Sequence, residues 1–249
     1  MYGWRGKVLR VDLTRGVVRE ESLDLRIAKD FIGGRGFGIQ RLLAEVDPAC
    51  DPLGPENVLI MAAGPLTGTK APTGGRYMVT TKSPLTGSIT CSNSGGHFPA
   101  ELKRAGVDMI SFHGQAAEPV SLWIEGDRIE LRPAAHLWGL STHDTETALQ
   151  KDAGGGVRVA CIGPAGERGV LFASIMNDRD RAAGRSGVGA VMGSKKLKAV
   201  VVRGKDDVPL YDARAFGELV KKLAKRFREN LKGGKHPLNL HGTAVTVMA

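Results

Sequence analysis

The spacing of hydrophobic and polar residues predicts a chain built mainly of short strands. Apolar residues alternate with polar ones, or form short continuous runs, between clusters of turn-forming residues, and both patterns are typical of strands. The segments 7–13 and 17–23 flank Thr14-Arg15-Gly16 and predict a hairpin. We expect the remaining strands at 57–63, 76–81, 88–92, 108–112, 120–125, 128–132, 157–162, 170–173 and 197–202.

Helical patterns are fewer and mostly short. The segment 98–105 has Pro99 in its first turn and Gly106 after its end, as helix termini prefer. Ser141 and Asp144 resemble a capping box that opens a helix to about residue 152. Further helices are expected at 24–32, 39–46 and from 188 to 192, with the glycine-rich segment 33–38 as a loop. Strands that follow one another as hairpins, with few long helices, indicate an α+β fold with largely antiparallel sheets.

The character of the chain changes after Pro209. From Asp212 the pattern is helical and basic, and it has no strand partner. We therefore expect one domain at residues 1–209 and the beginning of a second, helical domain at 210–249, incomplete in this chain.

Composition narrows the class of protein. The chain has 249 residues, of which 42% are hydrophobic and 24% charged, as in ordinary globular proteins. The net charge is +9, but residues 213–235 hold eight Lys or Arg against two Asp or Glu, without the regular interleaving of aromatic residues that would suggest base stacking. That pattern favours a solvated helix face over a nucleic-acid partner. No apolar run approaches the roughly 20 residues of a membrane span, and no signal peptide precedes the first strand, so we expect a cytoplasmic protein.

The cysteines give no sign of a metal centre within this chain. Cys50, Cys91 and Cys161 are scattered singly, without a CxxC pair. Their number and spacing argue against a zinc site, an iron–sulfur run and a disulfide framework.

Two segments rich in glycine and arginine are the candidate binding sites. The first extends from 71–76 through a strand-like stretch to 91–97, and the second covers 176–189. Glycine allows main-chain N–H groups to approach a ligand, and arginine offers a planar fork of donors to phosphate. Two such segments suggest one large anionic ligand or two similar ones. Each lies between a strand and a short helix, but the order of the pieces differs, so an internal duplication stays open.

Familiar nucleotide and metal motifs are absent from the sequence. There is no GxxxxGK[ST], no GxGxxG and no HExxH, and the glycines at 34, 36 and 38 follow a helix-like segment rather than a strand. Simple nucleotide binding therefore has little support.

Longer motifs resemble the N-terminal domain of the tungsten-containing aldehyde ferredoxin oxidoreductase family. The resemblance covers residues 1 to about 209, and 216–231 with 241–243 resemble the start of the family's second domain. The motifs are Met1-Tyr-Gly-Trp4, the segment 64–76, Lys82-Ser-Pro-Leu-Thr-Gly87, Ser92-Asn-Ser-Gly-Gly96, Ile162-Gly-Pro-Ala-Gly-Glu167 and the segment 176–195.

The resemblance implies an enzyme that oxidises aldehydes to carboxylic acids with tungsten or molybdenum. The metal would be held by two pterins, whose phosphates are bridged by Mg²⁺, on a base of two β-sheets. Asn93 and the carbonyl of Ala182 would complete the magnesium shell, which suits a hard cation. The implied cofactor contacts are Arg76, Asn93, Gly95, Arg181, Ala182, Gly184 and Arg185.

The rest of the implied machinery lies outside these residues. The family's [4Fe-4S] cluster ligands and acid–base residues belong to later domains, so no catalytic residue is assigned in this chain. Ferredoxin is the implied electron acceptor and a small aldehyde-type compound the implied substrate, with a homodimer or a second subunit also possible. The alternative is a stand-alone pterin- or anion-binding subunit without catalysis of its own.

Overall fold

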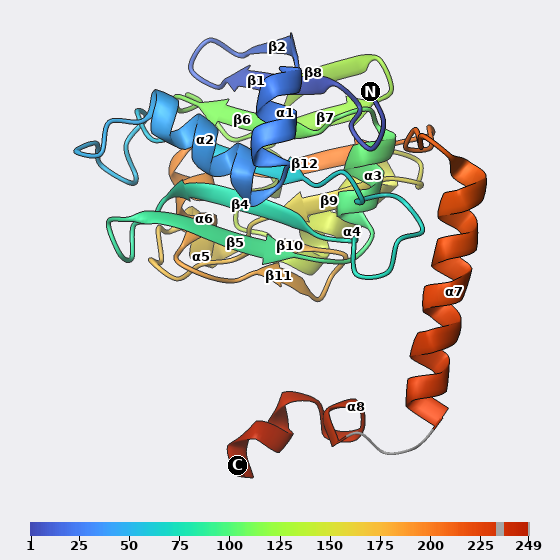
Figure 1. Cartoon of the computed structure of the whole chain (residues 1–249). Coiled ribbons are helices and arrows are strands. Elements are labelled where there is room, and N and C mark those ends of the chain that lie inside the picture. The colour runs from blue at the N-terminus through green and yellow to red at the C-terminus, as the bar shows by residue number, and fades with distance from the viewer. Residues whose placement is uncertain (233–236, 249) are drawn as a thin grey trace.

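The computed structural model describes residues 1–232 and 237–248, and its body consists of two six-stranded β-sheets (Figure 1). The strand orders are β2-β1-β6-β3-β4-β5 and β11-β10-β9-β12-β7-β8. Among the strands of the described residues, only β1/β6 and β7/β12 pair in parallel, so the expected α+β fold with largely antiparallel sheets is confirmed. The strands are β1 (Lys7–Asp12), β2 (Val17–Ser22), β3 (Leu59–Ala63), β4 (Tyr77–Lys82), β5 (Ile89–Ser94), β6 (Met109–His113), β7 (Val120–Glu125), β8 (Arg128–Pro133), β9 (Arg158–Cys161), β10 (Ile175–Asn177), β11 (Arg181–Ala183) and β12 (Leu197–Arg203).

The helices connect and cover these sheets. The longer ones have clear sequence causes: α4, for example, begins after Ser141, whose hydroxyl accepts a hydrogen bond from the Asp144 N–H at 3.1 Å. The helices are α1 (Leu25–Phe31), α2 (Arg35–Glu45), α3 (Phe98–Arg104), α4 (Thr142–Asp152), α5 (Pro164–Glu167), α6 (Val188–Ser194), α7 (Ala213–Lys232) and α8 (Pro237–His241), with 3₁₀ turns at Ala135–Leu137 and Gly242–Met248.

The two sheets share one topology. Read across each sheet from one edge to the other, the strands are the second, first, sixth, third, fourth and fifth in chain order, and the parallel pair joins the first strand to the sixth. The helices follow the same plan, since α2 and α4 precede the third strands while α3 and α6 precede the sixth. The chain therefore contains an internal structural duplication, although its two glycine–arginine segments differ in the order of their pieces.

Alternating residues of the strands face two different cores. Along β3, Leu59 and Met61 belong to the large core between the sheets, whereas Ile60 and Ala62 pack under α1 and α2. On the second sheet, outward residues such as Val201 pack under α4. Helices α3 and α6 contribute side chains to the core between the sheets. Because β5 directly precedes α3 and β11 directly precedes α6, this burial also fixes the ends of these two strands.

Several element predictions were wrong. Segment 170–173 is a turn, and the strand lies at 175–177, because Ala173 N–H closes the turn onto the Val170 carbonyl at 2.8 Å. Helix α2 starts at Arg35 and takes in part of the glycine run that was expected to be a loop. The short elements β11 and α5 were not foreseen.

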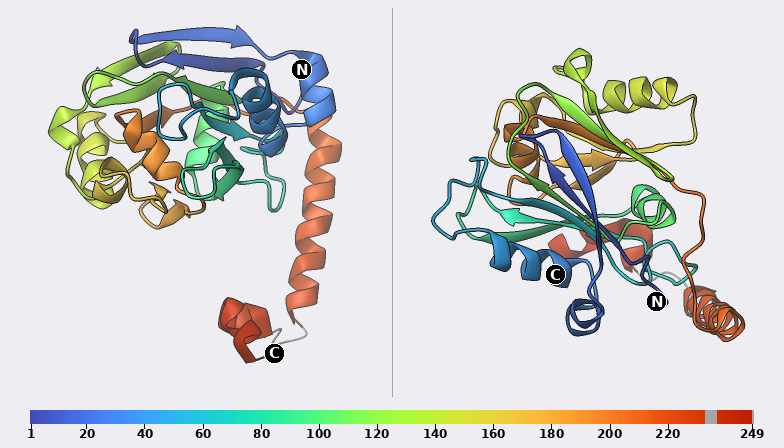
Figure 2. Two further views of the ribbon diagram at one scale, coloured as in Figure 1. Left: turned by 90° about the vertical axis from the view of Figure 1, so that its left-hand side faces the viewer. Right: turned by 90° about the horizontal axis from the view of Figure 1, so that it is seen from above.

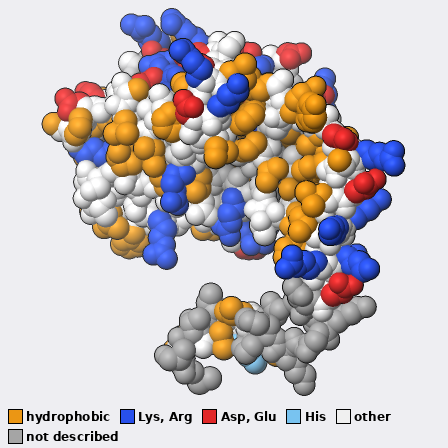
Figure 3. Space-filling view, in the orientation of Figure 1, with side chains coloured by type: hydrophobic (Ala, Val, Ile, Leu, Met, Phe, Trp, Pro, Cys, Tyr) orange, Lys and Arg blue, Asp and Glu red, His pale blue; other side chains and the backbone are white. Residues whose placement is uncertain are grey.

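Helix α7 projects away from the two-sheet body (Figure 2). Lys and Arg side chains gather along it (Figure 3), and among its apolar residues Leu219 and Phe227 are half exposed. The helix predicted from Asp212 onward is thus present, while residues 233–236 and 249 lie outside the described part. The assignment of 210–249 to a second domain stays a prediction. No helix in the described residues is long and apolar enough to cross a membrane.

Candidate cofactor site at two sheet edges

The two glycine–arginine segments lie side by side at neighbouring sheet edges. β5 ends the first sheet and β11 ends the second, and the two strands contact each other (Figure 1). The Arg185 N–H donates to the Ser92 hydroxyl at 3.0 Å, and the Ser83 hydroxyl donates to the Ser186 carbonyl at 2.8 Å. The fold thus brings together two segments that lie about ninety residues apart in the sequence.

Strand register places two of the predicted residues at equivalent positions. Met78, on the fourth strand of the first sheet, pairs with Asn93 on β5. Met176, on the fourth strand of the second sheet, pairs with Ala182 on β11. Because these strands occupy the same place in the duplicated topology, Asn93 and Ala182 are structural counterparts.

The predicted glycines follow the same relation. Gly95 and Gly184 each stand two residues beyond this counterpart pair. A Cβ added at Gly95 would have the Gly75 carbonyl as its nearest neighbour at 3.6 Å, an ordinary contact. Packing within the chain therefore does not require glycine at position 95, which leaves room for a ligand to approach the backbone there.

A concavity of about 590 Å³ opens beside Asn93. Arg76 lines it and donates from Nη1 to the Asn93 side-chain oxygen, while the Thr67 hydroxyl holds the Arg76 carbonyl at 3.1 Å. The N-terminus of α2 also faces this space, and its cap, Gly34, has φ +50 and offers no side chain. Backbone N–H groups, a helix dipole and a guanidinium together favour an anion. The residues that line this concavity are Ile32–Arg35, Gly64–Thr67, Gly74, Arg76, Met78 and Asn93.

A second concavity, of about 400 Å³, lies at the equivalent place in the second sheet. As in the first, its walls are the start of the covering helix, here α4, the loop after the third strand, and the fourth strand with Met176. Ser174 stands where the first half has Arg76, two residues before the paired methionine, so the second concavity lacks that cation. Its other lining residues are Ser141, Thr142, Gly163–Gly166, Phe172 and Ala173.

The remaining predicted residues are found near the junction of the edges. Arg181 is exposed on β11, and its Cγ lies beside Gly96. Arg185 is exposed, and its described contact to β5 is made by the backbone rather than the guanidinium. A shared cavity for the Arg76 and Arg185 side chains therefore stays a prediction.

Sequence reasoning missed two groups near the site. Gly34 was considered only in a weak dinucleotide motif and Gly33 was given no role, although two glycines directly before a helix are a usable signal for an anion site. Asn177 and Asp178 belong to the second glycine–arginine segment but were given no binding role, yet they contact the segment after β5. No local pattern could have shown that contact, because its partners are about eighty residues away.

Titratable side chains do not form a metal cluster here. Within residues 1–232 and 237–248, no group of three or more His, Cys, Asp or Glu is placed to hold a metal ion. Cys161, next to Met176 in the sheet, is buried, and burial raises the pKa of its thiol to about 12. It is therefore a neutral packing residue.

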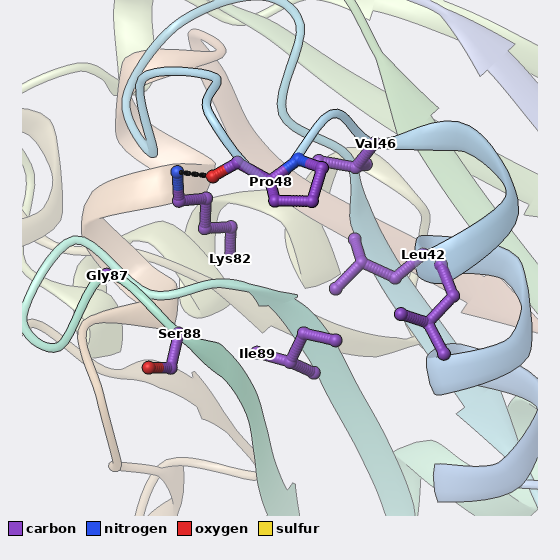
Figure 4. A pocket seen from close by; sticks show the side chains of 8 residues that line it. Leu42, Val46, Pro48, Lys82, Gly87, Ser88 and Ile89 are labelled. Carbon is purple, nitrogen blue, oxygen red and sulfur yellow. Dashed lines mark hydrogen bonds between the residues drawn. The ribbon is translucent and has the colours of Figure 1, made fainter.

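A separate apolar hollow lies at the opposite end of β5 (Figure 4). Leu42, Val46 and Ile89 form its walls, and its volume is about 160 Å³. The Lys82 ammonium donates to the Pro48 carbonyl at 2.6 Å and to the Cys50 carbonyl at 2.5 Å. Because its cation is taken up by the backbone, this hollow is not a counterpart of the anion site.

Comparison with known proteins supplies the family context. The family model for the N-terminal domain of aldehyde ferredoxin oxidoreductase matches residues 8–204. The tungsten-containing aldehyde ferredoxin oxidoreductase of Pyrococcus abyssi is 53% identical over 249 residues, which are 99% of this chain and 41% of that protein. The WOR-like subunit of aliphatic sulfonate oxidoreductase from Pyrococcus furiosus is 38% identical and matches 90% of this chain and 38% of its own length.

A solved structure matches the fold closely. The active site complex BamBC of benzoyl coenzyme A reductase, bound to 1,5 dienoyl-CoA, superposes with a TM-score of 0.89 at 40% identity. The match covers 92% of this chain and 36% of that one. The chain thus spans about two fifths of the length of the curated relatives.

Proposed function

Because this chain belongs to the aldehyde ferredoxin oxidoreductase family, we propose that it binds a bis-pterin tungsten or molybdenum cofactor along the β5 and β11 edges. One observation carries the proposal: Asn93-x-Gly95 and Ala182-x-Gly184 occupy equivalent positions on two edge strands that contact each other. A ligand made of two similar halves matches a surface made of two similar halves.

The two concavities suit the two pterins. We assign one pterin to the space beside Arg76 and the other to the space beside Met176. The helix N-terminus and the Arg76 guanidinium favour a phosphate or an electron-rich pterin edge in the first. Arg181 and Arg185, both exposed on or after β11, supply positive charge from the second sheet.

Main-chain oxygens are the better candidates for the magnesium ion. Ala182 has only a main-chain carbonyl to offer, and Asn93 is its structural counterpart. The Asn93 side-chain oxygen already accepts from Arg76, and a guanidinium and Mg²⁺ on one oxygen would repel each other. We therefore propose that the Asn93 main-chain carbonyl is its ligand, with the phosphates completing the shell.

The chain's own contribution is binding and orientation. When bound, the cofactor supplies oxidation chemistry, which for the family we take to be the conversion of aldehydes to carboxylic acids. We further propose that electrons leave through a [4Fe-4S] cluster, whose ligands lie outside these 249 residues, to ferredoxin. The relatives' greater length leaves room for those ligands and for the acid–base groups. Cytoplasmic localisation and a homodimer or second subunit are also proposals.

Metal and pterin analysis of the purified protein tests the assignment. We expect pterin, tungsten or molybdenum, and magnesium to co-purify with the wild-type chain, in a ratio of two pterins to one magnesium. Asn93→Ala keeps the main-chain carbonyl but removes the partner of Arg76. It should lower pterin content while leaving the magnesium-to-pterin ratio unchanged.

Two outcomes would contradict these statements separately. A wild-type protein free of pterin after anaerobic purification would count against cofactor binding and favour a different anion. A fall in the magnesium-to-pterin ratio in Asn93→Ala would instead identify the side-chain oxygen as the ligand.

A further inference from the structure

The turn between β10 and β11 reaches across to the end of β5. The Asp178 carboxylate oxygen Oδ2 accepts from the His97 N–H at 2.6 Å and from the Phe98 N–H at 3.0 Å. The neighbouring Asn177 amide donates to the Gly95 carbonyl at 2.8 Å. Two adjacent side chains of the second sheet thus hold the residues that directly follow Asn93 in the first.

The contact requires an unfavourable backbone conformation in the turn and close packing against Gly96. Asp178 and Arg179 have φ values of +47 and +63, a region that side-chain-bearing residues seldom adopt. A Cβ added at Gly96 would lie 2.3 Å from Asp178 Oδ2 and 3.1 Å from Asn177 Nδ2. The carboxylate can therefore reach the chain only because residue 96 is glycine.

The turn is anchored on its own side as well. The Glu146 carboxylate on α4, which is 4% exposed, accepts from the Arg179 N–H at 2.9 Å. The Arg158 guanidinium on β9 lies 3.8 Å from Asp178 Oδ1. Because Glu146 lies on a helix that packs against β9 and Arg158 lies on β9 itself, the turn that carries Asp178 is attached to the second half of the fold.

We propose that Asn177 and Asp178 are positioning residues that set the separation between β5 and β11, and hence between Asn93 and Ala182. The inference rests on the proposed function, in which one magnesium ion bridges phosphates between those two residues. The pair touches neither proposed magnesium ligand, but it fixes the backbone two to five residues beyond Asn93.

Hydrogen exchange and cofactor analysis together test this role. Asp178→Ala removes the acceptor, whereas Asp178→Asn keeps a side chain that caps helices and tolerates positive φ. Asn177→Ala removes the Gly95 contact and the hydrogen bond that the Asn177 amide donates to Asp178 Oδ2 at 2.9 Å, but leaves the Asp178 carboxylate in place. Asp24→Ala is the matched control, because Asp24 also caps a helix, accepting from the Arg26 N–H at 2.7 Å, but lies at α1.

We expect Asp178→Ala to raise amide exchange in 181–187 about tenfold, which corresponds to about 1.4 kcal/mol, although the deleted hydrogen bonds are donated by His97 and Phe98. The magnesium-to-pterin ratio of the purified protein should fall with it. Asp178→Asn should restore most of both, Asn177→Ala should give a smaller change of the same kind, and Asp24→Ala should change neither.

The outcomes separate this inference from the function on which it rests. Unchanged exchange in 181–187 for both Asp178→Ala and Asn177→Ala would overturn it, as would raised exchange with an unchanged magnesium-to-pterin ratio. Wild-type protein without pterin would instead defeat the proposed function. If Asp178→Ala does not fold, Asn177→Ala and Asp178→Asn give the same comparison.

Discussion

Lys195 shows how a single buried side chain ties the two halves together. It follows α6 of the second half, is 1% exposed, and donates to the carbonyls of Asn57 and Gly114, which flank β3 and β6 of the first sheet. Carbonyl partners without a carboxylate do not repay the full cost of removing an ammonium from water. Burial therefore lowers the pKa of Lys195 to about 8.

This pKa predicts a defined pH dependence of stability. The unfolded chain binds a proton at Lys195 up to about pH 10.5, whereas the folded chain releases it near pH 8. Between these values the unfolded state carries more protons, so stability rises with pH and is lowest below pH 8. Between pH 8 and about 10, the free energy of unfolding of the wild type should rise by roughly 2 kcal/mol relative to that of Lys195→Met.

Denaturant unfolding at several pH values measures this difference. Lys221→Met, at an exposed position of α7, controls for the loss of one positive charge. A constant difference between wild type and Lys195→Met across that range would show that the ammonium is not desolvated as its burial indicates.

At the residue scale, the sequence predicted the chemistry of the site better than the contacts between its residues. The glycines and arginines of the two segments pointed to an anion site because their chemistry is intrinsic to each residue. The Asn177 and Asp178 contacts depend on packing between segments eighty residues apart, which no local pattern encodes. The same limit applied to Ser174, whose equivalence to Arg76 is visible only through strand register.

Among the elements, α6 illustrates how a single glycine allows two helices to pack closely. Gly193 faces α5, and a Cβ there would lie 2.0 Å from the Gly166 carbonyl oxygen. Since that neighbour is backbone, it cannot rotate away as a side chain would. The contact fixes the position of Gly163–Gly166, the start of α5, which lines the second concavity.

Two matched Gly→Ala substitutions test this arrangement. Gly193→Ala should destabilise the protein by about 2 kcal/mol or more through overpacking. Gly217→Ala on α7, where no atom lies within 4 Å of the added Cβ, should be neutral or stabilise by about 0.5–1 kcal/mol through helix propensity. Free energies of unfolding from denaturant curves decide the point, and equal effects of the two substitutions would contradict it.

Elements were predictable where local signals agreed with tertiary packing. The capped helix after Ser141 and the hairpin around Gly16 follow from turn and cap residues and are confirmed. The apolar segment 170–173 was mistaken for a strand because hydrophobicity alone cannot separate a buried turn from a buried strand. β11, only three residues long, is a strand because β10 lies beside it.

The duplication belongs to the scale of the whole molecule. Each half repeats one strand order, yet the sequence left a repeat undecided because the residues that specify topology are distributed over pairings rather than motifs. Joining the halves at β5 and β11 places their sites next to each other. Each half supplies one concavity, and the proposed ligand with two pterins would need both.

The body should not need α7 for its stability. The described core clusters lie between Val8 and Val202, and none includes a residue of α7. The connecting residues do contribute: the Gly3 N–H donates to the Pro209 carbonyl at 2.8 Å, and Arg5 donates to the Asp207 carbonyl at 2.6 Å. Val208 is also buried, against Gly68.

Two truncations therefore have different expected effects. A chain ending after Pro209 keeps these contacts, so its free energy of unfolding should lie within about 1 kcal/mol of that of the full chain. A chain ending after Gly204 loses them, and its free energy of unfolding should be lower by about 2–3 kcal/mol. Urea unfolding monitored by circular dichroism compares them. If ending at Pro209 costs as much as ending at Gly204, then α7 stabilises the body despite projecting from it, and the boundary predicted at residues 209 and 210 is not a domain boundary.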